Sequence, residues 1–331
     1  MTISVALCTY NGEKFILPQL ESIAQQTIIP DEVVICDDRS TDKTIELIGN
    51  FAVTAPYDLQ LHKNETNVGS TKNFEKALLL CKGDIIFLCD QDDIWLPHKV
   101  EHVKKFFENN PEKKVVFTDA FMVDDNHVVQ HYLWDKIGFN KSSQKQWNKG
   151  YAFKYLVENN NCATGATMAI KKEILPGVLP FDSMNHWLHD GIIALKTSIN
   201  DQIGFIQDKL INYRQHSSQQ MGVRKDKPVL EVACNKIRSL QWIKKDPDLD
   251  TQLQDLITIR QWVRAAGKRN FDEFIEQKIS HLEKIKRVER KKFISKFFPV
   301  MKEWISGHYK TSLCYRNSRP LVYVMKDLLG I

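Results

Sequence analysis

The sequence lacks the features that would place it in several large classes of protein. No uninterrupted apolar run of about 18 residues is present, so no transmembrane helix is expected. The N-terminus, MTISVALCTYNG, has no basic stretch before its short apolar run, which predicts a first core strand and not a secretory signal. No GxGxxG follows a strand-like segment, which argues against a dinucleotide-binding dehydrogenase. We find no internal repeat and no low-complexity tract.

Cysteines are few and their spacing suggests no shared site. The seven cysteines include no CxxC pair, and several lie in apolar, strand-like runs, where a thiol behaves as a small hydrophobe. They are Cys8, Cys36, Cys81, Cys89, Cys162, Cys234 and Cys314. This pattern argues against a zinc site and predicts reduced thiols in a cytosolic protein.

The composition is that of a globular protein with an uneven charge. Of its 331 residues 43% are hydrophobic and 26% charged, which allows two lobes or one large domain with an appendage. From Lys225 to the end, 23 Lys and Arg stand against 13 Asp and Glu, whereas residues 1–224 hold 23 against 28. The basic part is either a solvated helical face or a surface that meets anionic lipid or polyanionic glycan.

Strand-like and helix-like segments alternate through the first half. The strand-like segments are ISVALCTY, DEVVICDD, DLQLHKN and DIIFLCDQDD, and those between them have apolar residues at helical spacing. This predicts an α/β domain with a doubly wound, mostly parallel sheet. Because ligands bind at the carboxyl ends of such strands, the polar ends predict one cleft. These ends are Thr9-Tyr10-Asn11, Asp37-Asp38 and Asp90 to Asp93.

The second half is less regular. Residues 136–161 are polar and aromatic, as in a loop or lobe over the cleft. CATGATMAIKKEIL predicts a strand and a helix, MNHWLHDGIIALKTSI a helix start, and GFIQDKLINYRQH a final strand. Beyond Lys225 three segments have helical periodicity and predict a C-terminal α-helical region: LEVACNKIRSLQWIKK, DTQLQDLITIRQWVRAA and FDEFIEQKISHLEKIKRVERKKFISKFF.

Three carboxylates stand at the end of DIIFLCDQDD. Asp90, Asp92 and Asp93 repel one another unless a cation or a shifted pKa relieves them. A small set of oxygen ligands suits Mg²⁺ or Mn²⁺ shared with substrate phosphates. The competing interpretation is a capped turn, in which Asp92 or Asp93 is the N-cap of the helix near Pro97.

The chain resembles family 2 glycosyltransferases of the GT-A fold, above all bacterial rhamnosyltransferases and O-antigen and capsule transferases. The resemblance is carried by six segments in order, TYNGEKFI, ICDDRSTDKT, NETNVGSTKNFEKAL, FLCDQDDIW, TGATMAI and YRQH, and covers about residues 2–220. It implies a Rossmann-like catalytic domain at 1–224, with nucleotide-sugar binding in 1–119 and the acceptor side and base in 120–224. The basic helical region is then 225–331.

The resemblance also implies roles on the nucleotide side. Thr9, Tyr10 and Glu13 line the base and ribose pocket in this reading. Asp38 accepts a hydrogen bond from the imide N–H of uracil or thymine, which disfavours cytosine. Arg39 stands where many relatives have Gly, which we interpret as a tolerated variation in a turn.

The phosphate and metal contacts follow from the same resemblance. Asn67, Gly69 and Lys72 fall at positions of nucleotide and phosphate contacts. Asp90 holds the ribose or a metal-bound water, and Asp92 is a ligand of the Mg²⁺ or Mn²⁺ that bridges the diphosphate.

On the acceptor side the resemblance implies a general base. Asp190 is the expected base, and His189 stands in the place of the usual Glu, either to orient the acceptor or only to pack. The competing interpretation of Asp190 is a helix N-cap before Gly191. His216 is a candidate for the metal or the pyrophosphate, and Arg214 for neutralising the diphosphate.

Taken together, the resemblance implies an inverting, metal-dependent glycosyltransferase. The expected donor is a UDP- or dTDP-sugar such as dTDP-rhamnose, and the acceptor is a hydroxyl of a cell-surface polysaccharide or a polyprenyl-linked glycan. Two alternatives stay open: a non-catalytic partner subunit that binds nucleotide sugar or glycan, and a sugar-phosphate nucleotidyltransferase, although CTYNGEKF is not its Gly-rich loop. No nucleic-acid partner is expected, because no base-stacking motif accompanies the basic charge.

The expected location is the cytoplasm, with peripheral contact at the inner face of the plasma membrane. KKFISKFFPVMKEWISGHYK, residues 291–310, mixes Lys with Phe, Trp, Ile and Met as interfacial segments do. The competing interpretation is a helix packed on the catalytic lobe, or a dimer interface.

Overall fold

The computed structural model describes residues 1–124, 128–216, 249–289 and 302, and the chain divides into two compact units. The first, here called the sheet unit, comprises Met1–Phe153, Asn161–Ser183 and Trp187–Val223. The second, the helical unit, comprises Lys154–Asn160, Met184–His186 and Arg224–Ile331. The predicted domain boundary at residue 224 lies outside the described residues and stays a prediction.

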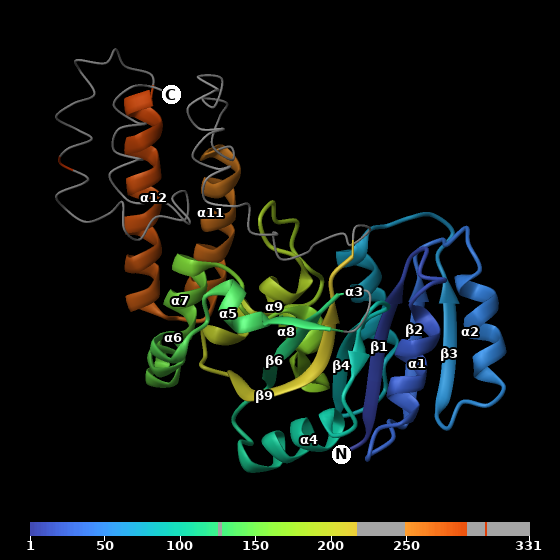
Figure 1. Cartoon of the computed structure of the whole chain (residues 1–331). Helices are drawn as coiled ribbons and strands as arrows, with labels where there is room; N and C mark the ends of the chain where they lie inside the picture. The colour runs from blue at the N-terminus through green and yellow to red at the C-terminus, as the bar shows by residue number, and fades with distance from the viewer. Residues whose placement is uncertain (125–127, 217–248, 290–301, 303–331) are drawn as a thin grey trace. The chain divides into compact units, whose positions relative to one another are not determined.

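Four parallel strands form the N-terminal half of the sheet, in the order β3-β2-β1-β4 (Figure 1). They are β1 (Ile3–Thr9), β2 (Glu32–Asp37), β3 (Asp58–Lys63) and β4 (Ile85–Asp90). The connections between them contain α1 (Ile16–Ala24), α2 (Thr44–Ala52) and α3 (Ser70–Leu80). β1 and β2 are buried along their whole length, as expected for strands covered on both faces, whereas the edge strand β3 is largely accessible. The predicted α/β alternation is confirmed.

The other half of the sheet is mixed and continues the order as β8-β6-β9-β5. Its strands are β5 (Ile94–Trp95), β6 (Val115–Val123), β8 (Ala169–Lys171) and β9 (Ile203–Arg214), with β7 (Val129–Tyr132) paired to β6. β8 is antiparallel to both β4 and β6, whereas β6 and β9 are parallel. β6 is one strand whose register against β9 shifts near Asp119.

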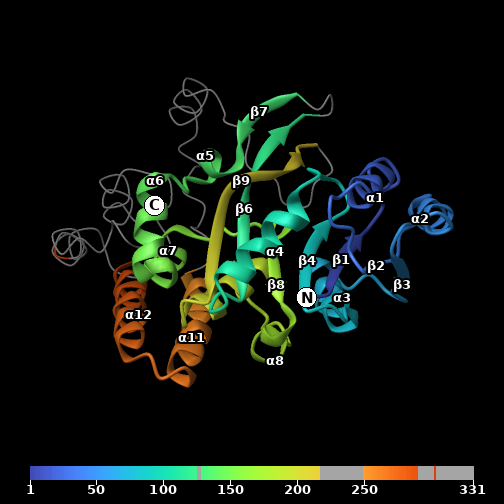
Figure 2. The same cartoon turned by 90° about the horizontal axis from the view of Figure 1, so that it is seen from below.

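The predicted loop or lobe at 136–161 is helical and lines no part of the pocket described below, so that expectation is wrong. The segment forms α5 (Leu133–Ile137), α6 (Lys141–Gln146), a π-helical turn (Trp147–Tyr151) and α7 (Ala152–Asn159). The aromatic rings of Phe139 and Trp147 are buried against Phe117 of β6, with centroids 5.5 and 5.3 Å from its ring. In Figure 2, α5 lies beside β6 and β9, at the opposite side of the sheet unit from β2 and β3. The aromatic residues there form a second core.

Two further helices belong to the sheet unit, and the second of them lines the pocket described below. α4 (Lys99–Asn109) follows β5, and α9 (His189–Ser198) precedes β9. Short 3-10 turns at Gly165–Thr167 and Lys172–Ile174 flank β8, and α8 (Leu175–Val178) follows. These segments fall where CATGATMAIKKEIL and MNHWLHDGIIALKTSI predicted a strand and helices.

The helical unit contains α11 (Leu249–Ala265) and α12 (Arg269–Glu289), in agreement with the second and third predicted helical segments. Their facing sides bury Ile259 and Ile275, and Arg260 pairs with Asp272 at 2.6 Å. In the same unit the buried Asp255 carboxylate accepts hydrogen bonds from the backbone amides of Asn185 and His186. LEVACNKIRSLQWIKK and the interfacial segment 291–310 lie almost wholly outside the described residues.

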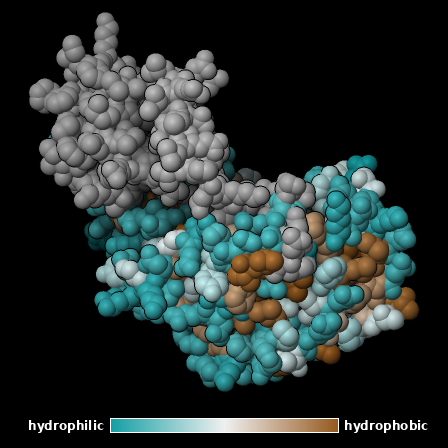
Figure 3. Space-filling model, in the orientation of Figure 1, coloured by the Kyte–Doolittle hydropathy of each residue, from teal (hydrophilic) through white to brown (hydrophobic). Residues whose placement is uncertain are grey.

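On the face seen in Figure 3 the surface is mostly hydrophilic, and the cysteines that the structure describes are free thiols. Within the described ranges, no helix is both long enough and apolar enough to cross a membrane. Figure 3 shows a face on which hydrophilic residues cover most of the coloured surface and apolar residues gather in limited areas. Five cysteines, Cys8, Cys36, Cys81, Cys89 and Cys162, are free and buried, and the other two lie outside the described residues.

Candidate active site

The carboxyl ends of β1, β2 and β4 open into one pocket of about 610 Å³ in the sheet unit. The register sets these ends side by side, because Thr9 pairs with Asp37 and Cys8 pairs with Asp90. Ten of the predicted site residues line this pocket: Thr9, Tyr10, Asp38, Asn67, Gly69, Asp90, Asp92, His189, Asp190 and His216. The polar strand ends therefore meet in one cleft, as the sequence predicted.

The ends of β1 and β4 are locked together by Gln91. Its side-chain amide accepts a hydrogen bond from the Tyr10 N–H at 2.9 Å and donates one to the Tyr10 carbonyl at 3.0 Å. Gly12 permits this contact, because a Cβ there would stand 2.2 Å from the Gln91 Oε1 atom. The Tyr10 side chain, 51% exposed, is left at the mouth of the pocket.

The acids that end β2 fix two loops. Asp37 is buried and accepts hydrogen bonds from the Thr9 hydroxyl and the Ser40 amide, at 2.7 and 2.8 Å. Asp38 holds the 64–69 loop, since its carboxylate accepts from the backbone amides of Val68 and Gly69 at 2.8 and 2.9 Å. The Asn64 side chain donates a third bond. A carboxylate has about four acceptor positions, so Asp38 retains capacity for a ligand.

The turn at Arg39 and the loop at Asn67 complete the nucleotide side. Arg39 has φ +69°, in the left-handed region where glycine costs least. The Asn67 side chain donates to the Asp38 carbonyl at 3.2 Å. Gly69, with φ +81°, lies immediately before α3.

The acids after β4 are held from the far strand, β9. The His216 Nε2 atom lies 2.8 Å from Asp92 Oδ2, and the His216 ring stacks on Phe15 with centroids 4.3 Å apart. The Arg214 amide donates to Asp93 Oδ1 at 3.1 Å, and its guanidinium donates to the Asp92 carbonyl at 3.0 Å. The N-cap of α4 is His98, so the interpretation of Asp92 or Asp93 as its N-cap is wrong.

Burial and mutual repulsion dominate the electrostatics of these acids. Burial, followed by repulsion from Asp92 and Asp190, raises the pKa of Asp90 to about 7. Burial and the charges of Asp92 and Asp90 likewise raise the pKa of Asp93 well above its usual range. The ammonium group of Lys99 opposes both increases. Burial and mutual repulsion thus disfavour the charged forms of Asp90 and Asp93, as is common at functional sites.

The opposite wall of the pocket carries Asp190, from the first turn of α9. Its Oδ2 accepts from the Gly165 amide at 2.9 Å and its Oδ1 from the Gly191 amide at 2.7 Å. The N-cap of α9 is Leu188, so the interpretation of Asp190 as N-cap is wrong. The carboxylate is instead held against the 3-10 turn at Gly165–Thr167.

His189 is packed and neutral. Its ring stacks on Phe74 of α3, with centroids 4.0 Å apart, and burial lowers its pKa. Neither ring nitrogen has a hydrogen-bond partner within the described part of the chain, yet His189 lines the pocket. The structure thus shows that His189 packs against Phe74. Whether a ring nitrogen also orients the acceptor substrate stays a prediction.

Three predicted residues are absent from the pocket lining made by the described residues: Glu13, Lys72 and Arg214. The Lys72 ammonium is half-exposed and pairs with Glu75 at 2.9 Å, and Glu13 accepts from the Lys43 amide at 3.2 Å. Their roles toward a ligand stay predictions. The sequence reasoning missed Gln91, although it stands between Asp90 and Asp92 in the same motif, and it missed Gly165 in TGATMAI.

The pocket offers only a partial set of donors for a divalent cation. Across the described ranges, no group of three or more His, Cys, Asp or Glu residues is placed so that it could hold a metal ion. Asp92, Asp90 and His216 instead offer two carboxylates and one imidazole at the pocket wall. Such partial sets suit Mg²⁺ or Mn²⁺, which keep waters and substrate phosphates among their ligands.

Comparisons with known proteins agree with this geometry. The family model for glycosyl transferase family 2 matches residues 4–175. The dTDP-rhamnosyl transferase RfbG of Shigella flexneri is 29% identical over 227 residues, which are 65% of this chain and 73% of RfbG. An uncharacterized protein of Mycobacterium bovis is 27% identical over 221 residues. That match covers 65% of this chain but only 59% of the length of the mycobacterial protein.

A solved structure shares the fold. The mannosyltransferase PcManGT from Pyrobaculum calidifontis, in complex with GDP-Man and Mn²⁺, matches with a TM-score of 0.52. The match covers 98% of this chain and 78% of the mannosyltransferase, at 16% sequence identity. Identity this low supports the fold alone.

Proposed function

The chain belongs to glycosyl transferase family 2, and from that premise we propose that it is an inverting, metal-dependent glycosyltransferase. The proposed donor is a UDP- or dTDP-sugar, and the proposed acceptor is a hydroxyl of a growing cell-surface polysaccharide or lipid-linked glycan. The observation that carries the proposal is the meeting of Asp38, Asp90, Asp92 and Asp190 in one pocket. We assign Asp38 to the nucleotide, Asp90 and Asp92 to the diphosphate and the metal, and Asp190 to the acceptor.

Asp92, together with Asp90 and His216, is the proposed holder of Mg²⁺ or Mn²⁺. The raised pKa of Asp90 and the 2.8 Å contact between His216 and Asp92 support a role for these side chains toward a cation. When bound, the ion stabilises the negative charge that develops on the departing diphosphate.

Asp190 is the proposed general base. Its carboxylate takes the proton of the acceptor hydroxyl while the hydroxyl oxygen forms its bond to the anomeric carbon of the donor. The bond between that carbon and the β-phosphate oxygen breaks, and the nucleoside diphosphate leaves with the electron pair. Attack from the face opposite the diphosphate inverts the configuration. The hydrogen bond from Gly165 supports this role, because it fixes one carboxylate oxygen at the pocket wall.

The nucleotide side is proposed to read the base. Asp38 is the proposed acceptor for the imide N–H of uracil or thymine, and Thr9, Tyr10 and Asn67 the proposed base and ribose contacts. The lining positions of these four residues support that assignment. The relative RfbG, a dTDP-rhamnosyl transferase, favours a dTDP-sugar among the two donor classes.

A donor screen tests the proposal. Thermal shifts of the protein are measured with UDP-, dTDP- and GDP-sugars, each with and without Mn²⁺, and product analysis follows on the donor that binds. We expect a Mn²⁺-dependent shift with a uridine or thymidine donor and a smaller one with GDP-mannose, because contacts proposed for a single pyrimidine ring do not match the larger bicyclic ring of guanine. A protein that binds none of these donors at millimolar concentration would contradict the proposal.

Peripheral contact with the inner face of the plasma membrane is proposed from the sequence 291–310, which lies almost wholly outside the described residues. Its test is binding to anionic liposomes by the full chain and by a chain ending at residue 290, at low and high salt. A full chain that ignores the liposomes at both salt concentrations would remove this part of the proposal.

A further inference from the structure

A lysine is buried beneath the pocket, at the start of α4. Lys99 has 0% of its surface exposed, although lysine is among the residues that proteins bury least often. Burial lowers the pKa of its ammonium group to about 8, against the opposing charges of Cys89, Asp93 and Asp90. A charge kept at this cost calls for a reason beyond packing, since an apolar side chain of similar volume would fill the space more favourably.

The ammonium group reaches across the site to the turn beside Asp190. Lys99 Nζ donates to the Ala166 carbonyl at 2.8 Å and lies 4.0 Å from the centroid of the Trp95 ring. Ala166 is the middle residue of the 3-10 turn Gly165–Thr167. The amide of its neighbour Gly165 is the donor to Asp190 Oδ2. One lysine thus connects the start of α4 with the turn whose Gly165 amide donates to Asp190.

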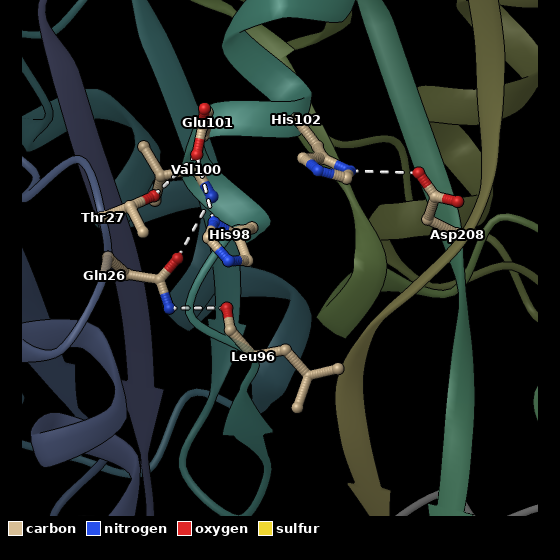
Figure 4. Close-up of polar contacts among 8 residues, drawn as sticks. All are labelled: Gln26, Thr27, Leu96, His98, Val100, Glu101, His102 and Asp208. Carbon is tan, nitrogen blue, oxygen red and sulfur yellow. Dashed lines mark hydrogen bonds and ion pairs between the residues drawn. The ribbon is translucent and has the colours of Figure 1, made fainter.

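Hydrogen bonds fix the backbone on both sides of Lys99. The Gln26 side chain donates to the Leu96 carbonyl at 2.8 Å and accepts from the Val100 amide at 3.1 Å, so it holds the chain on both sides of Lys99 (Figure 4). Two more bonds join this segment to the end of α1: the Thr27 amide donates to the Pro97 carbonyl at 2.9 Å, and the Trp95 amide to the Ser22 hydroxyl at 3.0 Å. Lys99 therefore starts from a fixed backbone.

The turn at the other end is tight and tied to β4. Within it the Met168 amide donates to the Gly165 carbonyl at 2.8 Å, and the Thr167 hydroxyl donates to the Thr164 carbonyl at 2.8 Å. The Leu88 amide of β4 donates to the Met168 carbonyl at 3.0 Å. Space beside Gly165 is short, because a Cβ there would lie 3.1 Å from His189 Nε2 and 3.4 Å from the Asp190 Cβ. A displacement of this turn is therefore passed directly to Asp190.

The geometry points to Lys99 as a positioning residue: its ammonium group holds the Ala166 carbonyl and so fixes the Gly165 amide that orients the Asp190 carboxylate. This inference rests on the proposed role of Asp190 as the base. Misplacing a reacting group by about 1 Å can cost about a hundredfold in rate. Loss of the lysine should therefore reduce kcat while leaving the nucleotide side of the pocket unchanged.

The test compares Lys99→Met, which keeps the volume but loses the donor, with Lys105→Met, which removes an exposed lysine from the same helix. For Lys99→Met we expect kcat to fall about 10- to 100-fold, with the donor Kd measured without Mn²⁺ changed less than about threefold. Lys105→Met should match the wild type. A merely structural role would alter stability or both constants together, and wild-type kcat in Lys99→Met would overturn the inference.

A double-mutant cycle shows whether Lys99 acts through Asp190. In an Asp190→Asn background, Lys99→Met should reduce the residual rate less than about twofold, since the residue that it positions is already disabled. Full additivity of the two losses would overturn the inference.

Hydrogen exchange supplies a readout that does not depend on transfer activity. The segment with Gly165 and Met168 should exchange about tenfold faster in Lys99→Met than in Lys105→Met, and unchanged exchange would contradict the inference. If Lys99→Met does not fold, Thr167→Val loosens the same turn from its other end, and wild-type kcat in that variant would count equally against it. A wild type without transfer to any acceptor would contradict the proposed function, whereas the exchange result would still decide the role of Lys99.

Discussion

The two walls of the pocket are built in different ways. The nucleotide wall comes from β1, β2 and β4, neighbouring parallel strands whose ends the register brings together. The reacting wall comes from segments that are distant in the sequence: Gly165 bonds Asp190, and Arg214 and His216 reach back to the acids after β4. The nucleotide wall follows from the regular pairing of neighbouring parallel strands, whereas the reacting wall depends on long-range packing of β8, β9 and α9. The walls should therefore fail differently when they are mutated.

The largest effect is expected on the reacting wall, at Asp190. Asp190→Asn keeps the shape of the side chain and removes the base, so kcat should fall about 10²- to 10⁴-fold. Donor binding in the presence of Mn²⁺ should remain within about threefold of the wild type, because the nucleotide wall is untouched. Steady-state kinetics and calorimetry make the measurement. Turnover at the wild-type rate would remove Asp190 as base.

Asp92→Asn is expected to weaken donor binding in the presence of Mn²⁺. The change removes one charged oxygen ligand, so Mn²⁺-dependent tightening of donor binding should largely disappear, while the weak metal-independent binding of the nucleotide persists. Calorimetry with and without Mn²⁺ measures the difference. The control is Asp84→Asn, which changes an exposed carboxylate just before β4, at the opposite end of that strand from Asp92. Equal Mn²⁺ dependence in both variants would show that Asp92 is no metal ligand.

A smaller effect is expected at Gly12, which tests the joint between β1 and β4. Gly12→Ala would drive the new Cβ into Gln91 and break its two bonds to Tyr10, at a cost of about 2 kcal/mol in the free energy of unfolding. Gly49→Ala in α2 is the matched control, because nothing lies within 4 Å of its Cβ and alanine favours a helix. Denaturant unfolding of both variants gives the comparison. Equal stability would mean that Gln91 does not tie the strand ends.

The smallest effect is a pH dependence from Lys99. The folded-state pKa is about 8, below the value of about 10.4 in an unfolded chain, so the unfolded state binds more protons between these values. Stability relative to Lys99→Met should consequently rise as the pH increases, by about 1 kcal/mol from about pH 8 to about pH 9. Urea unfolding of both proteins at the two pH values measures it. A constant difference would show that Lys99 does not titrate in this range.

The comparison also explains which predictions from the sequence held. The strands of the nucleotide wall were predictable, because unbroken apolar runs such as Val33–Cys36 identify buried strands and each is followed by a helical period. The expectation of a loop or lobe over the cleft at 136–161 was wrong, because the many polar residues there conceal that Phe139 and Trp147 pack into a core with Phe117. Periodicity in a short helix cannot show what lies opposite its buried face.

The sequence by itself determined the α/β alternation and the acids that end three strands, because both follow from local side-chain pattern and the geometry of βα units. Only the tertiary structure decided what those acids face. The stacking of His189 on Phe74, the contact of His216 with Asp92, and the reach of Lys99 to Ala166 all join residues whose separation in sequence carries no periodic signal. Those pairings arise when the strands and helices pack, since packing sets which distant side chains lie within bonding distance.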